Sequence, residues 1–196
     1  NHTAATDNSN LNLAVPNYYY RQNSQGCFSN GSGCGNELAS ERSMVRKMIV
    51  DSVIFWASEY HIDGFRFDLM GLHDITTMTK IREELNKIDE SIIVYGEGWT
   101  GGDSPLLDSE KSTKLNIIKY GDLQIAAFSD EMRDGIRGHV FENSVPGFVN
   151  GYKGVEEMIK FGIVASVKHD QIKYGINPSP YEGYSVTFWA NKPYQT

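Results

Sequence analysis

The stretch that most constrains the fold is IDGFRFD, residues 62–68, which has the composition of a buried strand but ends in charged residues. Because successive side chains of a strand point to opposite faces, Phe65 and Phe67 share one face. Arg66 and Asp68 share the other face, which is polar. A polar face on a buried strand is typical of the inside of a parallel barrel near its mouth, where catalytic groups lie at the C-terminal ends of strands. Asp68 is therefore a candidate catalytic residue.

Helices and strands alternate around this stretch. An apolar residue recurs at every third or fourth position of residues 45–60, which predicts a helix that Ser40 caps and that runs up to the strand. A second helix is predicted to begin after its cap, Asp74, and is followed by a short apolar run, residues 92–97, that ends in an acid. This order is typical of a parallel α/β fold. The apolar positions of the first helix are Val45, Ile49, Val53, Trp56 and Tyr60.

A third strand is predicted over residues 123–128, and its end is again polar. A short helix is expected over residues 131–137, and another within residues 155–163. Three strands with polar C-terminal ends amount to part of a (β/α)8 TIM barrel, since a complete barrel takes about 250 residues. The sequence also opens without Met, so we expect residues 1–196 to be an internal part of one catalytic barrel domain.

Residues 1–39 are rich in Asn, Ser, Gly and Tyr and show no sustained period of two or of 3.6, which predicts a long βα loop. Loops longer than about 15 residues are uncommon unless they are functional, so this loop is expected to wall a site. It also holds Cys27 and Cys34, which could close a small ring in an oxidising compartment.

Composition limits the classes of partner that the chain is expected to bind. A net charge of -7 and a pI near 5.2 argue against nucleic acid, which requires a basic face. No apolar run approaches the roughly 18 residues of a membrane span, so no membrane partner is predicted. The 11 Tyr residues suit stacking on sugars and ordinary packing equally. Secreted, cell-surface and cytoplasmic locations all stay open.

The two strand-end acids, Asp68 and Glu97, are separated by 97 − 68 = 29 residues, close to one strand-helix unit. They should therefore stand on neighbouring strands, which lie ~4.8 Å apart. Retaining glycoside hydrolases need two carboxyl groups about 5 to 5.5 Å apart, one to attack the anomeric carbon and one to protonate the leaving oxygen and then activate water. The spacing predicts such a pair.

The neighbours of the acids suit these two roles. Arg66 lies on the same face as Asp68, and a cation favours the ionised carboxylate that a nucleophile must be. A proton donor must instead keep its proton near neutral pH, which burial against apolar groups promotes, and Tyr95 and Trp99 are the nearest such groups to Glu97. The alternative is structural, with Arg66 and Asp68 as an ion pair and Glu97 as a strand-end cap.

Several motifs resemble one enzyme family. GFRFDLMG at residues 64–71 and YGEGW at residues 95–99 resemble the nucleophile and acid/base motifs of the α-amylase superfamily, glycoside hydrolase family 13, and are closest to its type I pullulanases. His2 resembles the His that ends the first conserved motif of that superfamily and contacts the sugar. NGSGCGNELASER at residues 30–42 and FSDEMRDGIRG at residues 128–138 are also similar to pullulanase segments.

The resemblance implies a bacterial retaining enzyme that cleaves α-1,6 branch linkages in pullulan, glycogen or starch-derived dextrins. Asp68 would end strand four of the barrel as nucleophile, and Glu97 would end strand five as acid/base. The chain would run from about the end of strand three to before strand seven, so that the third acid of the superfamily lies outside it. His169 and Asp170 have the letters of that third motif but follow a helix, so we interpret them as a surface pair.

The expected site is thus catalytic Asp68 and Glu97 with four substrate-binding residues: His2, Arg66, Tyr95 and Trp99. The expected partner is an α-glucan. The chemistry requires no cofactor, and a structural calcium ion stays open. No metal site is predicted, because no metal-ligand spacing links His61 and His73, which more often cap or pack.

Three alternatives remain. The chain could belong to another α-amylase superfamily glucan hydrolase or transferase. It could be a metal-dependent barrel enzyme of enolase type, in which Asp130 supplies a third acid, although Arg66 would compete with the metal. A non-catalytic glycan-binding module would account for the aromatic residues but would leave the acids unexplained.

Overall fold

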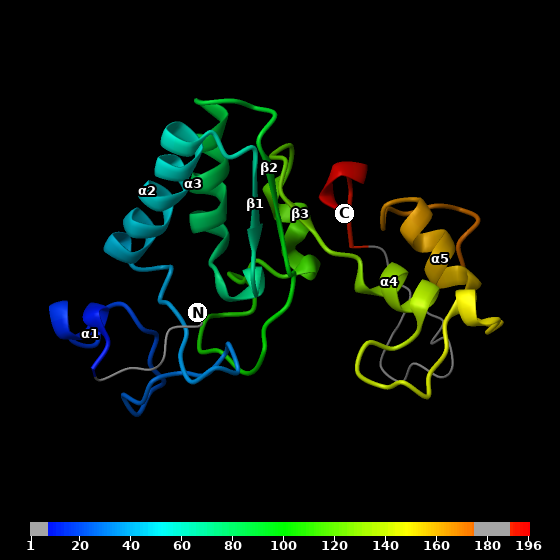
Figure 1. Cartoon of the computed structure of the whole chain (residues 1–196), viewed down its shortest axis with the longest axis horizontal. Helices are drawn as coiled ribbons and strands as arrows, with labels where there is room; N and C mark the ends of the chain where they lie inside the picture. The colour runs from blue at the N-terminus through cyan, green and yellow to red at the C-terminus, as the bar shows by residue number, and fades with distance from the viewer. Residues whose placement is uncertain (1–7, 175–188) are drawn as a thin grey trace. The chain divides into compact units, whose positions relative to one another are not determined.

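The computed structural model describes residues 8–174 and 189–196, which fall into two compact units, Asn1–Ala127 and Phe128–Thr196. The first unit holds the predicted alternation of helices and parallel strands (Figure 1). Its elements are α1 (Asn10–Ala14), α2 (Ser43–Tyr60), β1 (Gly64–Phe67), η1 (Met70–Leu72), α3 (Ile75–Asn86), β2 (Ile93–Gly96), η2 (Lys114–Tyr120) and β3 (Ala126–Ala127).

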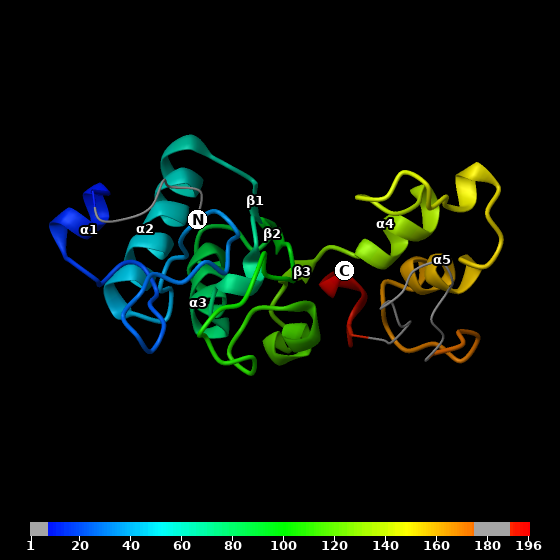
Figure 2. The same cartoon turned by 90° about the horizontal axis from the view of Figure 1, so that it is seen from below.

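The three strands form one parallel sheet in the order β1-β2-β3. Phe67 lies opposite Gly96, and Tyr95 lies opposite Ala126. The helices α2 and α3 lie side by side next to the strands (Figures 1 and 2). The predicted α/β class with a parallel sheet is confirmed. The third strand is shorter than predicted, because the amide of Ile125 turns back to the carbonyl of Leu123 and residues before Ala126 leave the extended conformation.

Strand β1 alternates as predicted but is only half-buried in the first unit. Phe65 and Phe67 are half-buried, whereas Gly64 and Arg66 are exposed. The ring of Phe67 packs edge-on against the imidazole of His73, with 5.7 Å between the ring centroids. The polar side of the strand therefore faces solvent in this unit, as a binding site requires.

The start of α2 differs from the prediction. Arg42 occupies the N-cap position without a side-chain hydrogen bond, so the expectation that Ser40 caps this helix is wrong. Ser40 is fully buried, and its Oγ accepts from the amide of Asp74 at 2.9 Å. Its carbonyl oxygen accepts from the Thr77 hydroxyl at 2.9 Å. Ser40 joins the start of α2 to the start of α3, because the amide that precedes α3 needs a buried acceptor.

The apolar stripe of α2 is buried along only part of its length. Val45 and Val53 are buried, whereas Trp56 is 44% and Tyr60 is 59% exposed, contrary to the predicted stripe. The rings of Trp56 and Tyr60 lie 4.7 Å apart, and Phe55 packs edge-on against both. These aromatic rings pack on one another because the described part of the unit places no further layer over the end of this helix.

Helix α3 begins as predicted. The Asp74 carboxylate accepts from the amide of Thr77 at 3.0 Å and from its hydroxyl at 2.5 Å, which satisfies donors of the first turn. The guanidinium of Arg82 is buried beneath the far end of the helix and donates to the carbonyl oxygens of Ile92 and Asp89. This contact fixes the turn that leads into β2. The buried apolar face of the helix consists of Met78, Ile81 and Leu85.

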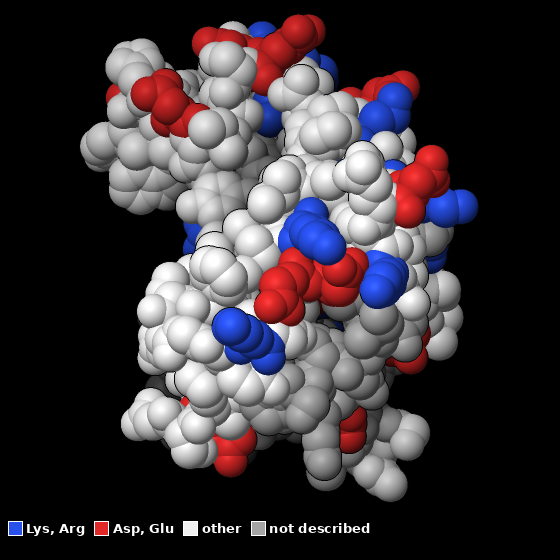
Figure 3. All heavy atoms as spheres, turned by 90° about the vertical axis from the view of Figure 1, so that its right-hand side faces the viewer, with Lys and Arg blue, Asp and Glu red and all other residues white. Residues whose placement is uncertain are grey.

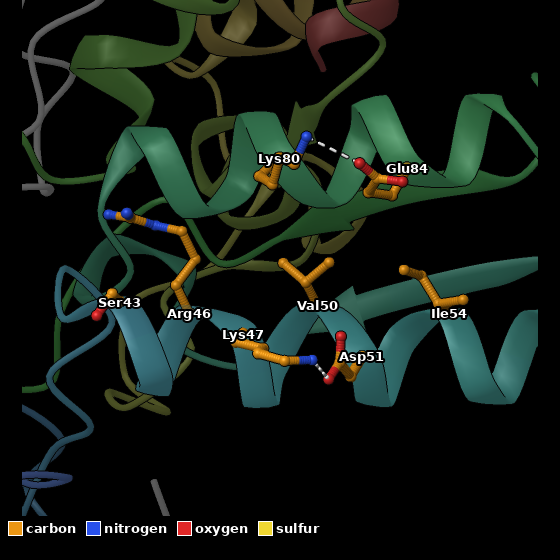
Figure 4. A pocket seen from close by; sticks show the side chains of 8 residues that line it. All are labelled: Ser43, Arg46, Lys47, Val50, Asp51, Ile54, Lys80 and Glu84. Carbon is orange, nitrogen blue, oxygen red and sulfur yellow. Dashed lines mark hydrogen bonds and ion pairs between the residues drawn. The ribbon is translucent and has the colours of Figure 1, made fainter.

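A groove of about 350 Å³ runs between α2 and α3 (Figure 4). Ion pairs lie along both rims, Lys47 with Asp51 on α2 and Lys80 with Glu84 on α3, the latter at 2.8 Å. All of its lining residues belong to the two helices, and none of the predicted site residues is among them. This groove is therefore separate from the candidate site.

In the described part of the long N-terminal loop, residues 8–39, α1 is accompanied by isolated antiparallel bridges between Tyr20 and Leu38 and between Gln22 and Phe28. Cys27 and Cys34 are exposed thiols. Apart from α1, this segment is irregular, as predicted. Within the described ranges, no helix combines the length and apolar character that crossing a membrane would require.

The second unit contains α4 (Asp130–Arg137), η3 (Phe148–Asn150), α5 (Glu156–Ile163) and η4 (Pro193–Gln195). Ser129 caps α4, and Gly162 of α5 lies against Met132 of α4, so that the two helices pack closely. Acidic and basic side chains alternate on the face shown in Figure 3. On α5, Lys160 pairs with Glu157 at 2.7 Å. Such mixed charge favours a solvated face over a field of one sign.

Candidate active site

One guanidinium brings the two predicted acids together. Arg66 donates from Nη1 to Oδ1 of Asp68 and from Nη2 to Oε1 of Glu97, each at 2.7 Å. The side chains of Arg66, Asp68 and Glu97 are 40%, 36% and 19% exposed. The site is thus open to solvent on the side of Asp68, and Glu97 lies deeper.

Strand register accounts for this placement. Phe67 and Gly96 are the last paired residues of β1 and β2, so each acid directly follows its strand at the same edge of the sheet. The amide of Glu97 donates to the carbonyl oxygen of Phe67 at 3.0 Å, which continues the ladder by one residue. Asp68 and Glu97 therefore stand side by side, as the 29-residue spacing predicted.

The chain turns sharply after Asp68. Leu69 adopts φ 45° and ψ 51°, a left-handed conformation that is costly for a residue with a side chain. In this conformation its amide points at the neighbouring strand and donates to Oε2 of Glu97 at 2.8 Å. Both oxygens of Glu97 thus accept hydrogen bonds from the segment that carries Asp68. The strain is retained at a residue that links the two acids.

Two glycines allow the strand-end loops to approach each other. A Cβ on Gly71 would collide with the backbone of Trp99, and the Gly71 amide donates to the carbonyl oxygen of Glu97 at 3.1 Å. A Cβ on Gly98 would lie 2.8 Å from the amide nitrogen of Lys114, whose N–H donates to the Gly98 carbonyl. Any larger side chain at either position would push the loops apart and displace Glu97.

The aromatic candidates lie beside the acids. Tyr95 is half-buried on β2 and is paired in register with Arg66. Trp99 is half-buried and lines a cavity of about 640 Å³ next to η2. Neither Asp68 nor Glu97 lines this cavity, and most of its lining residues are polar. They include Thr100, Asp108, Ser109, Lys111, Thr113, Lys114, Asn116 and Lys119.

The histidines take structural places in the first unit. His61 ends α2 in a left-handed conformation, with φ 53°. His73 is buried against Phe67, and burial lowers its pKa to about 4, so its imidazole is neutral. Both observations agree with capping and packing. His2 lies outside the described residues.

The second unit holds the remaining sequence candidates. Asp130 opens α4, and His169 and Asp170 are exposed, as expected for a surface pair. In residues 8–174 and 189–196, no group of three or more His, Cys, Asp or Glu side chains is arranged to hold a metal ion.

Sequence reasoning assigned Arg66 to Asp68 and missed its bond to Glu97. The signal was available, because Arg66 and Asp68 share a face and a long side chain reaches across the ~4.8 Å between adjacent strands. No feature of the sequence indicates the hydrogen bond from Leu69 to Glu97. It depends on a left-handed Leu, which sequence patterns do not indicate.

Comparisons with known proteins show what the chain as a whole is similar to. No family model matches the chain. Over 166 residues it is 38% identical to a pullulanase of Bacillus subtilis (strain 168), a match that covers 85% of this chain and 23% of the relative. The structure of a pullulanase from Paenibacillus barengoltzii in complex with maltohexaose and α-cyclodextrin superposes with a TM-score of 0.80 at 39% identity, covering 95% of this chain and 26% of that one. Pullulanase from Bacillus acidopullulyticus superposes with a TM-score of 0.79 at 45% identity, and the match covers 85% of this chain and 20% of that one.

These relatives show that the chain is homologous to the pullulanases over most of its length, which confirms the resemblance that its motifs predicted. The chain spans 23% of the length of the Bacillus subtilis relative and 12% to 15% of the length of the next four curated pullulanases that it matches.

Proposed function

We propose that this chain carries the catalytic acids of a retaining glycoside hydrolase that cleaves α-1,6 branch linkages in pullulan, glycogen or starch-derived dextrins. The observation that carries the proposal is the placement of Asp68 and Glu97 at adjacent ends of neighbouring parallel strands, held by one arginine. The homology to pullulanases supports the linkage. The relative solved with maltohexaose and α-cyclodextrin supports an α-glucan as the ligand.

In this mechanism the Asp68 carboxylate attacks the anomeric carbon and forms a glycosyl ester. Glu97 gives its proton to the departing glycosidic oxygen and then takes a proton from the water that hydrolyses the ester, so the anomeric configuration is retained. Arg66 holds both carboxyl groups against the same point of the substrate. Tyr95 and Trp99 supply aromatic surface for the sugar rings, and His2 adds a contact at the cleavage subsite.

The wider architecture belongs to the same proposal. Sequential neighbours in a parallel sheet, in the order β1-β2-β3, suit strands four, five and six of a (β/α)8 barrel. Residues 1–196 would then be part of one barrel domain, with residues 1–39 as a long βα loop and the third acid outside the chain. The chemistry needs no cofactor, and any calcium ion would be structural.

The roles are tested by trapping the covalent intermediate on the complete enzyme. A fluorinated glycosyl substrate should label the peptide that contains Asp68, and label on Glu97 would falsify the assignment. Glu97→Gln should lose roughly 10² to 10⁴ in rate on pullulan and recover on substrates whose leaving group needs no proton. Asp68→Asn should not recover. Asp63→Asn, at the opposite end of β1, is the matched control and should keep its activity.

The linkage is tested separately. The complete enzyme should release reducing ends from pullulan and hardly any from unbranched amylose. The reverse preference would exclude debranching and favour another glucan hydrolase or transferase of the same superfamily.

A further inference from the structure

Arg21 is a buried cation in the irregular loop that precedes α2. It is only 3% exposed, and all five N–H groups of its guanidinium are donated. Nη1 donates to Oε1 of Glu37 at 2.8 Å and to Oγ of Ser104 at 3.1 Å. Nη2 donates to Oε2 of Glu41 at 2.8 Å and to the carbonyl oxygen of Leu72 at 3.2 Å, while Nε contacts the Glu41 carboxylate.

These acceptors lie in segments that are far apart in the sequence. Leu72 ends the η1 turn that follows Asp68, and Ser104 lies in the loop that follows Glu97 and Trp99. Glu41 lies next to Arg42, the N-cap of α2. One side chain therefore connects the loop after β1 with the loop after β2, and both with the start of α2.

The connection continues to the acids over a short path. Next to Leu72, Gly71 donates its amide to the carbonyl oxygen of Glu97 at 3.1 Å and packs against the backbone of Trp99. On the other side of the η1 turn, its N-cap residue Leu69 donates its amide to the Glu97 carboxylate. The backbone segment that Arg21 holds thus contacts Glu97 at two points and carries Asp68 at its start.

The charges explain why only an arginine fits there. Burial lowers the pKa of Arg21, but its hydrogen bonds and ion pairs with Glu41 and Glu37 outweigh that effect and raise the pKa overall, so the guanidinium stays charged. Glu37 is fully buried, and its Oε1 also accepts from Ser104 at 2.6 Å. A lysine ammonium could supply the charge but not the planar fork that reaches four acceptor groups.

We propose that Arg21 is a positioning residue for catalysis, which holds the loops after β1 and β2 in the relative placement that brings Asp68 and Glu97 to one point of the substrate. The proposal rests on the catalytic roles proposed above. The hydrogen bonds of the Arg21 guanidinium go to Glu37, Glu41, Ser104 and Leu72 and not to Asp68 or Glu97, so Arg21 would act through the loops and not on the acids directly.

The test uses the complete enzyme. Because Arg21→Met alone would leave Glu37 as an uncompensated buried charge, the main variant is Arg21→Met with Glu37→Gln. Turnover of pullulan is measured well below the melting temperature and normalised to folded protein by near-ultraviolet circular dichroism. We expect kcat to fall about 10²-fold, the loss that a displacement of roughly 1 Å can cause, while KM changes less than threefold.

The matched control is Arg82→Met, which removes an equally buried arginine at the opposite end of the strands. It should lower the melting temperature but leave kcat per folded molecule within twofold of the wild type. A purely structural Arg21 would behave in the same way, so an unchanged kcat in the double variant would overturn the proposal.

Two further variants keep the test decisive if the double variant does not fold. Arg21→Lys and Ser104→Ala retain the buried charge balance and weaken only the geometry. Both should lower kcat more than they raise KM, and wild-type kcat in both would refute positioning. Failure of the proposed function would give a different result, namely no label on Asp68 in the wild-type enzyme. The two failures can therefore be distinguished.

Discussion

At the scale of single residues, the candidate site depends on the guanidinium of Arg66. Asp68 and Glu97 stand at adjacent strand ends, and this one cation donates a hydrogen bond of 2.7 Å to each of them. The planar fork fixes direction as well as distance, because each nitrogen serves a different strand. The acids are thereby oriented before any substrate arrives.

A second residue, His73, makes stability depend on pH. Burial lowers the pKa of its imidazole from 6.5 to about 4 in the folded protein. An unfolded chain binds this proton near pH 6.5 and the folded chain only near pH 4, so acid favours unfolding. The free energy of unfolding is therefore highest above pH 6.5 and falls as the pH is lowered from 6.5 to 4. The whole loss is about 3 kcal/mol, because each unit of pKa shift corresponds to about 1.4 kcal/mol.

We therefore expect His73→Gln to reduce the loss of melting temperature between pH 7.5 and pH 4.5. Thermal unfolding of the complete enzyme, followed at both pH values, measures this difference. His169→Gln is the control, because His169 is exposed and should leave the pH dependence of the wild type intact. If the melting temperatures of the wild type and of His73→Gln fell equally between the two pH values, protonation of His73 would not destabilise the folded protein.

At the scale of elements, the start of α3 is the main connection between the two helices. Asp74 caps α3 through Thr77 and pairs with Arg46 of α2 at 3.0 Å. Burial alone would raise the pKa of Asp74, but hydrogen bonds from Thr77 and Ser40 and the charge of Arg46 lower it overall. One buried carboxylate thus serves as a helix cap and as an interhelical ion pair.

Asp74→Ala should destabilise the protein by about 2 kcal/mol or more, because loss of a cap costs up to about 2 kcal/mol and Arg46 also loses its partner. Chemical denaturation of the complete enzyme measures the change. Asp51→Ala removes an exposed i,i+4 partner of Lys47 on α2 and should change stability by less than about 1 kcal/mol. Similar effects of the two variants would contradict the assigned role of Asp74.

At this scale, some features of the fold and the site could be predicted from the sequence and others could not. The Asp74 cap of α3, the presence of β2 and the adjacency of Asp68 and Glu97 follow from local periodicity and chain length, so they were predictable. The role of Ser40 was not, because a buried serine can satisfy either its own helix or a neighbouring one. Arg21 carried no signal, since its partners lie as far away as Ser104 and only the tertiary structure brings them together.

At the scale of the whole molecule, residues 1–196 made alone are expected neither to hydrolyse pullulan nor to form a stable monomer. Trp56 and Tyr60 are exposed on α2, and β1 pairs with β2 along one edge only in the described sheet. Exposed aromatic rings and open strand edges favour association with other chains. Catalytic groups must also be held within about 0.5 Å, which such a chain would not achieve.

Light scattering and pullulan turnover of the isolated polypeptide test this expectation, with the complete enzyme as the reference. A compact monomer with activity near that of the complete enzyme would mean that the two units suffice for folding and catalysis.

The cation shared at the strand ends also has a consequence for the order of events. In the proposed mechanism Glu97 still holds its proton when the Asp68 carboxylate attacks, so the negative charge of the pair lies on Asp68. Once Asp68 has become an ester and Glu97 has given up its proton, that charge lies on Glu97 instead. Because the guanidinium of Arg66 bonds both carboxyl groups, the same cation is the counter-ion before and after the covalent step.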